Sequence, residues 1–386
     1  MTKKLLGAAS TLLLIFAFSI SAIKTKAQSS AAAANPGPKK AEEVFKNIQV
    51  LKGIPADQVF PTMQFITASL GVECDFCHVR DAFEKDDKKP KATARKMMEM
   101  MFAINSDNFD RHRAVTCYSC HRGSVQPAAI PAVMIEEPRQ PMGEPHRAEA
   151  DKASSDAKES TGPTADQLLD KYIQAVGGAS AVDKISSRVM KGSIDFSGKS
   201  LPIDIYARDP EKRISLTHMP NGDSVTAFNG KEGWLGTPGR PLREMHGSDL
   251  DGAAIDADLH LATDFKQMFS KMRVEGTEKI DDHQTQVVVG ERQDKTPIRL
   301  YFDEQSGLLV RLVRFGETAL GWLPTQIDYA DYRELNGVKV PYRWTLARPS
   351  GKFTIQVSEM QQNVPVDDAK FVKPEAPQEQ PKAPAK

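Results

Sequence analysis

Two short motifs in the first third of the chain combine cysteine and histidine at a fixed spacing. Residues 74–78 read CDFCH and residues 117–121 read CYSCH, so both are C-x-x-C-H sequences. Two thiols one helical turn apart can bond to the two vinyl groups along one porphyrin edge, and the adjacent histidine then lies beneath the iron. The motifs therefore predict two covalently bound c-type haems, attached through Cys74, Cys77, Cys117 and Cys120, with His78 and His121 as iron ligands.

Disulfides and a zinc site are the alternatives for four cysteines arranged as two C-x-x-C pairs. Neither alternative explains why a histidine follows both pairs directly, since the 386 residues contain only eight histidines. The pairs also use every cysteine of the chain. We therefore interpret both motifs as haem sites.

A haem that only transfers electrons usually has a sixth ligand on its iron, either a methionine thioether or a second histidine. Met63 is the only methionine upstream of the first motif in the exported part of the chain, and it lies eleven residues before Cys74. It is the candidate for the first haem. The second haem has several candidates, and spacing alone does not choose among Met97, Met98, Met100, Met101 and His112.

The elements that would carry these ligands are helical. Apolar side chains over residues 61–70 predict a helix that ends at Gly71, and residues 92–104 predict a second helix. In the second helix Met97, Met101 and Ile104 recur at spacings of four and three, which places them on one face. This region is small and rich in charge, so a buried prosthetic group would add to its core.

Composition shifts divide the rest of the chain. An uncharged run after Lys3 and Lys4 predicts a secretory signal peptide over residues 1–27, although an uncleaved run of this length would anchor the chain in a membrane. The remaining predicted segments are a flexible leader at 28–40, a dihaem cytochrome c domain at 41–123, a proline-rich linker at 124–163, an antiparallel β-rich half-barrel-like domain at 164–373, and a disordered tail at 374–386.

The expected C-terminal domain begins with a capping box at Thr164 and Gln167 and a helix that ends at Gly177. Strand-like runs separated by turn residues follow, and a helix near 256–271 interrupts them. The predicted strands are Ser193–Phe196, Leu201–Ala207, Arg213–Thr217, Gln286–Gly290, Ile298–Phe302, Leu308–Phe315, Thr325–Tyr332, Tyr342–Ala347 and Phe353–Gln356. The predicted fold is therefore multidomain, with a mostly helical cytochrome domain followed by an α+β domain with a curved antiparallel sheet. This layout is similar to half-barrels that carry apolar ligands. Its tryptophans either line an apolar concavity or pack in the core: Trp234, Trp322 and Trp344.

Several function classes find no support. Lys+Arg and Asp+Glu both number 51, so the basic excess typical of a nucleic-acid binder is absent. The histidines of the C-terminal domain are scattered without metal-ligand spacing, and no nucleophile elbow, zinc-protease or phosphate-loop motif occurs.

The haem segments resemble the cytochrome c subunit of bacterial photosynthetic reaction centres. The resemblance covers residues 45–130 and includes the blocks before and after both motifs, such as Arg95-Lys96-Met97 and Val115 to Gly123. It implies that Met63 is the sixth ligand of the first haem and that Met97, after two basic residues, is that of the second. Members of this family commonly carry four haem motifs, whereas this chain has two.

Together these observations predict an exported, periplasmic dihaem cytochrome that carries single electrons between redox proteins or to a membrane electron-transfer complex. Such a protein is not an enzyme. The alternatives are a peroxidase-like oxidoreductase with one open haem iron, and a haem-bearing binding protein for an apolar ligand.

Overall fold

The computed structural model describes residues 39–127, 162–349 and 351–374. These residues belong to one unit of the chain, which begins at Lys39. The expected signal segment and almost all of the expected leader, linker and tail lie outside the described residues. Within the described parts, no helix is both long and apolar enough to span a membrane.

Residues 39–127 form helices joined by turns. The helices are α1 (Ala41–Val44), the 3₁₀ helix η1 (Ala56–Gln58), α2 (Val59–Leu70), α3 (Cys74–Cys77), α4 (Lys89–Asn108) and α5 (Cys117–His121). As expected, α2 ends at Gly71, which adopts a left-handed φ of +66°. A Cβ atom at Gly71 would lie 2.2 Å from the carbonyl oxygen of Gly123, so glycine allows this close approach.

The buried face of α4 differs from the predicted one. Met98, Met101 and Asn105 are buried, whereas Met97 is 39% exposed, so the predicted shared face of Met97 and Met101 does not pack as a unit. Asn105 explains the difference, because its amide donates to the Val115 carbonyl at 2.7 Å and its oxygen accepts from the Val115 amide at 2.9 Å. These bonds turn the face that contains Asn105 inward.

A small apolar cluster lies beside these helices. Phe65 and Ile66 of α2 pack with Met98 and Met101 of α4. The same cluster contains three more buried residues: Leu51, Leu320 and Leu323. Only five of its seven buried members therefore come from residues 39–127.

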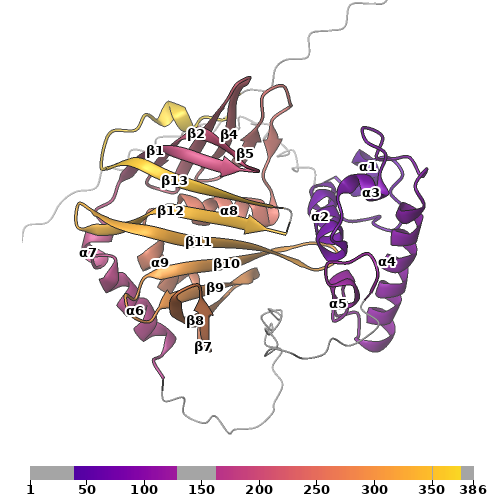
Figure 1. Ribbon diagram of the computed structural model, residues 1–386, viewed down its shortest axis with the longest axis horizontal. Helices are drawn as coiled ribbons and strands as arrows, with labels where there is room; N and C mark the ends of the chain where they lie inside the picture. The colour runs from indigo at the N-terminus through magenta and orange to yellow at the C-terminus, as the bar shows by residue number, and fades with distance from the viewer. Residues whose placement is uncertain (1–38, 128–161, 350, 375–386) are drawn as a thin grey trace, which may run out of the picture. The chain divides into compact units, whose positions relative to one another are not determined.

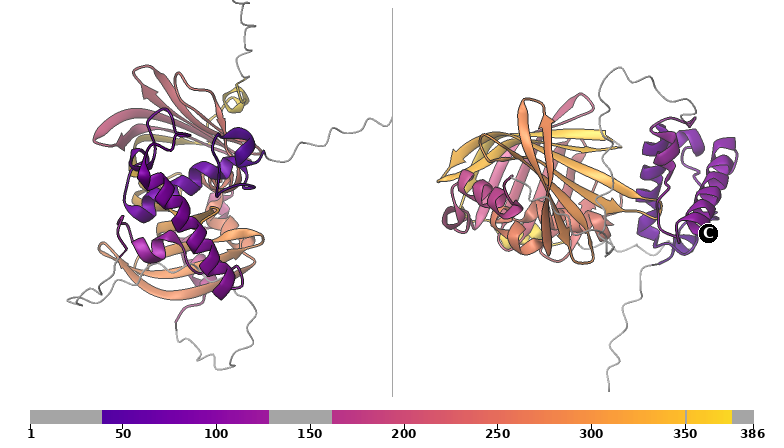
Figure 2. Two further views of the ribbon diagram at one scale, coloured as in Figure 1. Left: turned by 90° about the vertical axis from the view of Figure 1, so that its right-hand side faces the viewer. Right: turned by 90° about the horizontal axis from the view of Figure 1, so that it is seen from below.

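The C-terminal part is built on one antiparallel sheet of thirteen strands (Figures 1 and 2). The strands are β1 (Ser187–Phe196), β2 (Lys199–Arg208), β3 (Lys212–Met219), β4 (Gly222–Asn229), β5 (Gly233–Gly236), β6 (Arg243–Glu244), β7 (Lys271–Ile280), β8 (His283–Arg292), β9 (Lys295–Asp303), β10 (Leu309–Glu317), β11 (Trp322–Leu335), β12 (Val338–Arg348) and β13 (Gly351–Gln362). Their order is β6-β5-β4-β3-β2-β1-β13-β12-β11-β10-β9-β8-β7, so the first strand pairs with the last. The predicted curved antiparallel sheet is confirmed.

Helices cover the inner face of this sheet. They are α6 (Ala165–Ala175), α7 (Ala179–Val182), α8 (Gly247–Ala257) and α9 (Leu261–Met268), and a 3₁₀ helix η2 (Asp368–Phe371) lies near the end of the chain. The largest cluster of buried residues joins Leu169 of α6 and Phe265 of α9 to the strands. The predicted capping box of α6 is present, because the Thr164 hydroxyl accepts from the Gln167 amide at 3.2 Å.

Two predictions about this part were wrong in detail. The single helix expected near 256–271 is two helices, because Asp258 is extended (ψ 111°) and residues from Lys271 onward belong to β7. Four strands were not predicted: β4, β5, β6 and β7. The last of these, β7, is largely exposed, so its sequence lacks the apolar alternation that identifies a half-buried strand.

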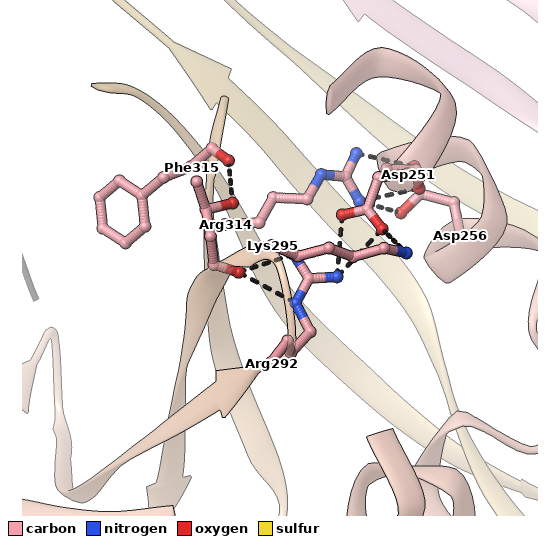
Figure 3. Close-up of polar contacts among 8 residues, drawn as sticks. Asp251, Asp256, Arg292, Lys295, Arg314 and Phe315 are labelled. Carbon is pink, nitrogen blue, oxygen red and sulfur yellow. Dashed lines mark hydrogen bonds and ion pairs between the residues drawn. The ribbon is translucent and has the colours of Figure 1, made fainter. Parts of the chain in front are cut away.

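Ion pairs hold α8 against the sheet (Figure 3). Arg314 of β10 makes a bidentate pair with Asp256, at 2.7 and 3.0 Å, and donates to the Gly252 carbonyl at 3.1 Å. Asp251 pairs with Arg292 at 2.8 Å and with Lys295 at 2.7 Å. Charge pairs therefore connect the middle and the C-terminal end of α8 to the strands.

Candidate haem-binding site

The first motif is a single helical turn. Cys74 and Cys77 begin and end α3, and His78 follows as its C-cap residue. The Nδ1 atom of His78 lies 2.9 Å from the carbonyl oxygen of Phe83, and the two rings are 5.2 Å apart. The short helix therefore presents both cysteines and the histidine from one turn of backbone.

The second motif repeats this arrangement. Cys117, Cys120 and His121 all lie on α5, which begins after a capping box between Thr116 and Ser119. The Nδ1 atom of His121 lies 3.0 Å from the carbonyl oxygen of Ser124. In both motifs the histidine Nδ1 atom is thus hydrogen-bonded to a backbone carbonyl oxygen a few residues downstream.

These two hydrogen bonds decide which ring nitrogen can bind a metal. A carbonyl oxygen only accepts, so Nδ1 of each histidine must carry the proton and donate. The lone pair of the neutral ring is then on Nε2, the atom left to ligate iron. The residues present therefore fit a proximal histidine at each motif.

A charged loop supports the first histidine. Lys91 at the start of α4 also donates to the Phe83 carbonyl, at 2.8 Å, and pairs with Asp86 at 3.0 Å. Asp86 pairs with Arg95 at 3.0 Å as well. The Arg95 and Lys91 side chains hold the pKa of the Asp86 carboxyl far below its usual range. Asp86 is therefore ionised near neutral pH and keeps both ion pairs.

The four thiols are free of disulfides. Cys74 and Cys120 are exposed, whereas Cys77 and Cys117 are partly buried, and burial raises the pKa of both buried thiols. Within the described residues, no group of three or more His, Cys, Asp and Glu side chains is placed to hold a metal ion.

The candidate sixth ligands differ in burial. Met63 lies on α2 and is half-buried at the edge of the small cluster. On α4, Met98 and Met101 are core residues, 6% and 5% exposed, whereas Met97 and Met100 are 39% and 49% exposed. His112 is exposed in the segment between α4 and α5. Among the methionines of α4, Met97 and Met100 can ligate a group outside the cluster without removing a buried side chain from the core.

Apolar side chains are unusually exposed in this part of the chain. Eleven of the thirteen large hydrophobic residues found exposed among the described residues lie between Val44 and Val125. They include Phe76 inside the first motif, Tyr118 inside the second, and both Met97 and Met100. An apolar macrocycle attached at the motifs would cover part of this surface, which is consistent with a haem-binding role.

Comparisons with known proteins agree with this geometry. Residues 17–201 match the family model described as the photosynthetic reaction centre cytochrome C subunit. The reaction centre cytochrome c subunit of Thermochromatium tepidum is 40% identical over 105 residues, and that of Rubrivivax gelatinosus is 35% identical over 101 residues. Cytochrome c-554 of Chloroflexus aurantiacus is 32% identical over 85 residues, which are 20% of each chain.

The N-terminal part of this chain is similar to the photosynthetic reaction centre cytochrome c subunit family. This similarity supports a c-type cytochrome, a class of protein that binds haem covalently. The chain spans about a quarter of the length of the two reaction centre relatives, 26% and 27%, and those matches cover 26% and 25% of this chain.

Solved structures give more distant matches. A LolA superfamily protein from Nitrosomonas europaea aligns with 55% of this chain and 99% of its own length, at 15% identity and a TM-score of 0.38. A putative outer membrane lipoprotein-sorting protein domain from Vibrio parahaemolyticus aligns with 53% of this chain and 97% of its own length, at 10% identity and a TM-score of 0.38.

The sheet also encloses a cavity of about 420 Å³. Apolar side chains of several strands line it, including Ile203, Ile355 and Trp344. The other two tryptophans pack in apolar clusters, Trp234 of β5 with Ile214 and Ala227, and Trp322 against Phe315. Of the two alternatives for the tryptophans, Trp344 therefore follows the concavity and the other two follow core packing. No sequence motif singled out the basic residues Arg188 and Arg213, which also line the cavity.

Proposed function

We propose that this protein is a periplasmic dihaem c-type cytochrome that passes single electrons between redox partners. One observation carries the proposal: both C-x-x-C-H motifs form a single helical turn whose histidine uses Nδ1 on a backbone carbonyl. An identical hydrogen-bonding arrangement at two sites is what two proximal haem ligands require. The similarity of this part of the chain to the reaction centre cytochrome c subunits supports the same function.

Each residue of the motifs has a defined task in this proposal. Cys74 and Cys77 would hold one porphyrin edge through thioether bonds, and Cys117 and Cys120 would hold the other haem. His78 and His121 bind iron through Nε2, with their rings fixed by the carbonyls of Phe83 and Ser124. The bound haem supplies a reversible one-electron couple of its iron.

Met63 and Met97 are the proposed sixth ligands of the first and second haem. The resemblance to the reaction centre cytochrome subunit assigns Met63 to the haem of His78 and Met97 to the haem of His121. The helix that carries Met97, α4, contacts both motif helices, α3 and α5.

The partners follow from this chemistry. A haem whose iron has two protein ligands, a histidine and a methionine, would have no open coordination position and would exchange electrons without binding a substrate. The donor and acceptor would therefore be redox proteins or a membrane electron-transfer complex. The predicted signal segment would export the chain, either released into the periplasm or anchored there if the segment is retained.

The first test is a pyridine haemochrome assay on protein matured in a host with c-type haem machinery. We expect two covalent haems per chain and the weak near-infrared band of methionine–iron ligation in the oxidised protein. A Cys117→Ser/Cys120→Ser variant should retain one haem, and the matched Cys74→Ser/Cys77→Ser variant should retain the other. Absence of covalent haem from the wild-type chain would disprove the proposal.

The enzyme alternative predicts a different reaction with an added ligand. A peroxidase-like protein has one open iron, so it would bind cyanide rapidly, whereas a six-coordinate carrier would bind it slowly at both haems. Rapid binding at one haem, together with loss of one half of the near-infrared band, would favour the alternative.

The cavity supports a second proposed function, the binding of an apolar molecule by the C-terminal part. Its volume of about 420 Å³ lies within the roughly 300–1,000 Å³ range of small-molecule pockets. Most of its lining side chains are aliphatic or aromatic. Saturable binding of a long-chain alcohol to the full chain would support this function, and absence of binding would contradict it.

A further inference from the structure

The cavity in the sheet has a polar end as well as an apolar wall. Its apolar lining follows the inner face of β1, β2, β12 and β13, with Ile194 and Ile203 on one side and Trp344 and Ile355 on the other. The charged residues that line the cavity are mostly basic. Six are basic: Arg188, Arg213, Arg243, Arg314, Lys339 and Arg348. Three are acidic: Asp249, Asp256 and Asp258.

Strand register places two of the arginines in one row. Arg188 of β1 is directly opposite Ala207 of β2, and Ala207 is directly opposite Arg213 of β3. Residues directly opposite one another in an antiparallel sheet share a face, and neighbouring strands are about 4.8 Å apart. The two arginines therefore start about 10 Å apart on the inner face, with only the methyl group of Ala207 between them.

The row continues into the apolar wall. The next row of residues on the inner face of the same strands contains Met190, Ile205 and Ser215. The row after it contains Ile203 and Thr217. Charge is thus confined to one end of β1 to β3, and the surface becomes apolar along the strands.

Two of the three acidic residues of the cavity pair with other arginines, and the third, Asp258, accepts a hydrogen bond from the His260 amide at 2.7 Å. Asp256 forms its bidentate pair with Arg314 (Figure 3), and Asp249 lies 3.3 Å from Arg243 and 3.8 Å from Arg348. Among the residues that the structure describes, neither Arg188 nor Arg213 forms an ion pair with a carboxylate.

The side chain that accepts a hydrogen bond from Arg188 is neutral. In the amide orientation that satisfies its surroundings, Gln362 accepts from Nη2 of Arg188 at 3.1 Å, while the buried Nε of Arg188 has no hydrogen-bond acceptor. Burial lowers the pKa of Arg188 to about 10 and lowers that of Arg213 as well, so both guanidinium groups remain charged at neutral pH. Asp256 also acts electrostatically on Arg213, but Arg314 already forms the bidentate ion pair with this carboxylate. Two partly buried positive charges with no ion pair of their own are costly unless a ligand supplies negative charge.

We propose that the cavity binds an amphiphile with one alkyl chain and an anionic head group, and that the head group lies between Arg188 and Arg213. The alkyl chain would extend over Met190 and Ile203 towards Trp344. A carboxylate or phosphate head fits the donors of a guanidinium group equally well. This inference rests on the proposed apolar-ligand function of the cavity and adds the charge and position of the head group.

Isothermal titration calorimetry on the full haem-loaded chain tests this proposal with three probes of equal chain length: decanoate, decanol and decyltrimethylammonium. We expect decanoate to bind most tightly and the cation least. Arg213→Met and Arg188→Met should each weaken decanoate binding by about ten-fold or more, since hydrogen bonds to charged groups contribute that much. Decanol binding should change by less than about two-fold.

Control variants separate the head group from the fold. Arg343→Met removes an exposed arginine of β12 that does not line the cavity, and it should leave decanoate binding unchanged. Arg213→Lys retains the charge and should recover part of the affinity, with thermal unfolding by circular dichroism confirming the fold of each variant. Decyl phosphate and inorganic phosphate distinguish a lipid-like ligand from a free anion, because only the former should bind tightly.

Two results would overturn the proposal in different ways. Equal binding of decanoate and decanol, with no effect of the arginine variants, would leave the apolar-ligand function intact and disprove the anionic head group. Absence of binding by all three decyl probes would disprove both.

Discussion

At the scale of single residues, the two exposed methionines of α4 provide the sharpest test of the haem ligands. Met97 and Met100 lie on the same helix with similar exposure, 39% and 49%, yet only Met97 is proposed to bind iron. Met97→His should lower the potential of one haem by on the order of 0.1 V, because imidazole stabilises ferric iron relative to a thioether. Redox titration followed by absorption spectroscopy measures this change.

Met100→His is the matched control for that experiment. It should leave both potentials and the near-infrared band unchanged, because Met100 is not a proposed ligand of either iron. If Met100→His lowers a potential and Met97→His does not, Met100 is the sixth ligand.

At the scale of elements, the packing of α8 depends on Gly252, which lies directly against the side chain of Arg314. A Cβ atom at Gly252 would lie 2.8 Å from Cζ of Arg314, whose guanidinium is fixed by Asp256. Helix propensity alone predicts that Gly252→Ala stabilises the protein by about 1 kcal/mol. We expect the opposite, a loss of about 1–3 kcal/mol, because the pinned guanidinium cannot move away without breaking its ion pair. Urea unfolding followed by circular dichroism gives the sign, and a stabilised variant would show that Arg314 moves freely.

The C-terminal end of α8 provides a pH-dependent prediction. Burial raises the pKa of Asp258 to about 6, and this residue is the C-cap, where the helix dipole also disfavours a negative charge. The raised folded-state pKa means that ionisation of Asp258 destabilises the fold as the pH rises from about 4 to above 6. Asp258→Asn should therefore stabilise the protein by about 1–2 kcal/mol near pH 8, after a discount for partial exposure, and by almost nothing near pH 4.

The amide at position 258 can still accept the hydrogen bond from the His260 amide, which is 2.7 Å long in the wild-type chain. Asp282→Asn, in the exposed turn between β7 and β8, is the control and should show no such pH dependence. A gain for Asp258→Asn that is equal at both pH values would show that charge is not its cause.

At the scale of the whole molecule, the two parts of the chain should differ in their need for haem. The exposed large hydrophobic residues are concentrated between Val44 and Val125, and the small cluster there has few buried members. The sheet part has a much larger buried core. Chain produced without haem attachment should therefore be cut by protease within residues 39–127 while residues 163–373 resist digestion.

Limited proteolysis with mass spectrometry of the fragments tests this difference. The haem-loaded chain is the control, and it should resist cleavage in both parts. Equal digestion of both parts in the haem-free chain would show that the C-terminal sheet also depends on the prosthetic group.

The sequence by itself predicted the chemistry of the proposed haem sites. Thioether attachment and axial ligation depend on residue type at a spacing of a single helical turn, so Cys74, Cys77 and His78 are recognisable without a fold. Local signals also placed α2 with its end at Gly71 and the capping box at Thr164, because a left-handed glycine and a reciprocal cap act over a few residues.

Only the tertiary structure decided which faces are buried and what lies between distant strands. Asn105 turns Met98 and Met101 inward through bonds to Val115, and no periodicity in the helix sequence predicts that choice. Likewise, Arg188 and Arg213 are twenty-five positions apart and become neighbours in one row through the register of β1, β2 and β3. Local preferences fix elements within a few residues, whereas burial and strand register depend on contacts made by the whole folded chain.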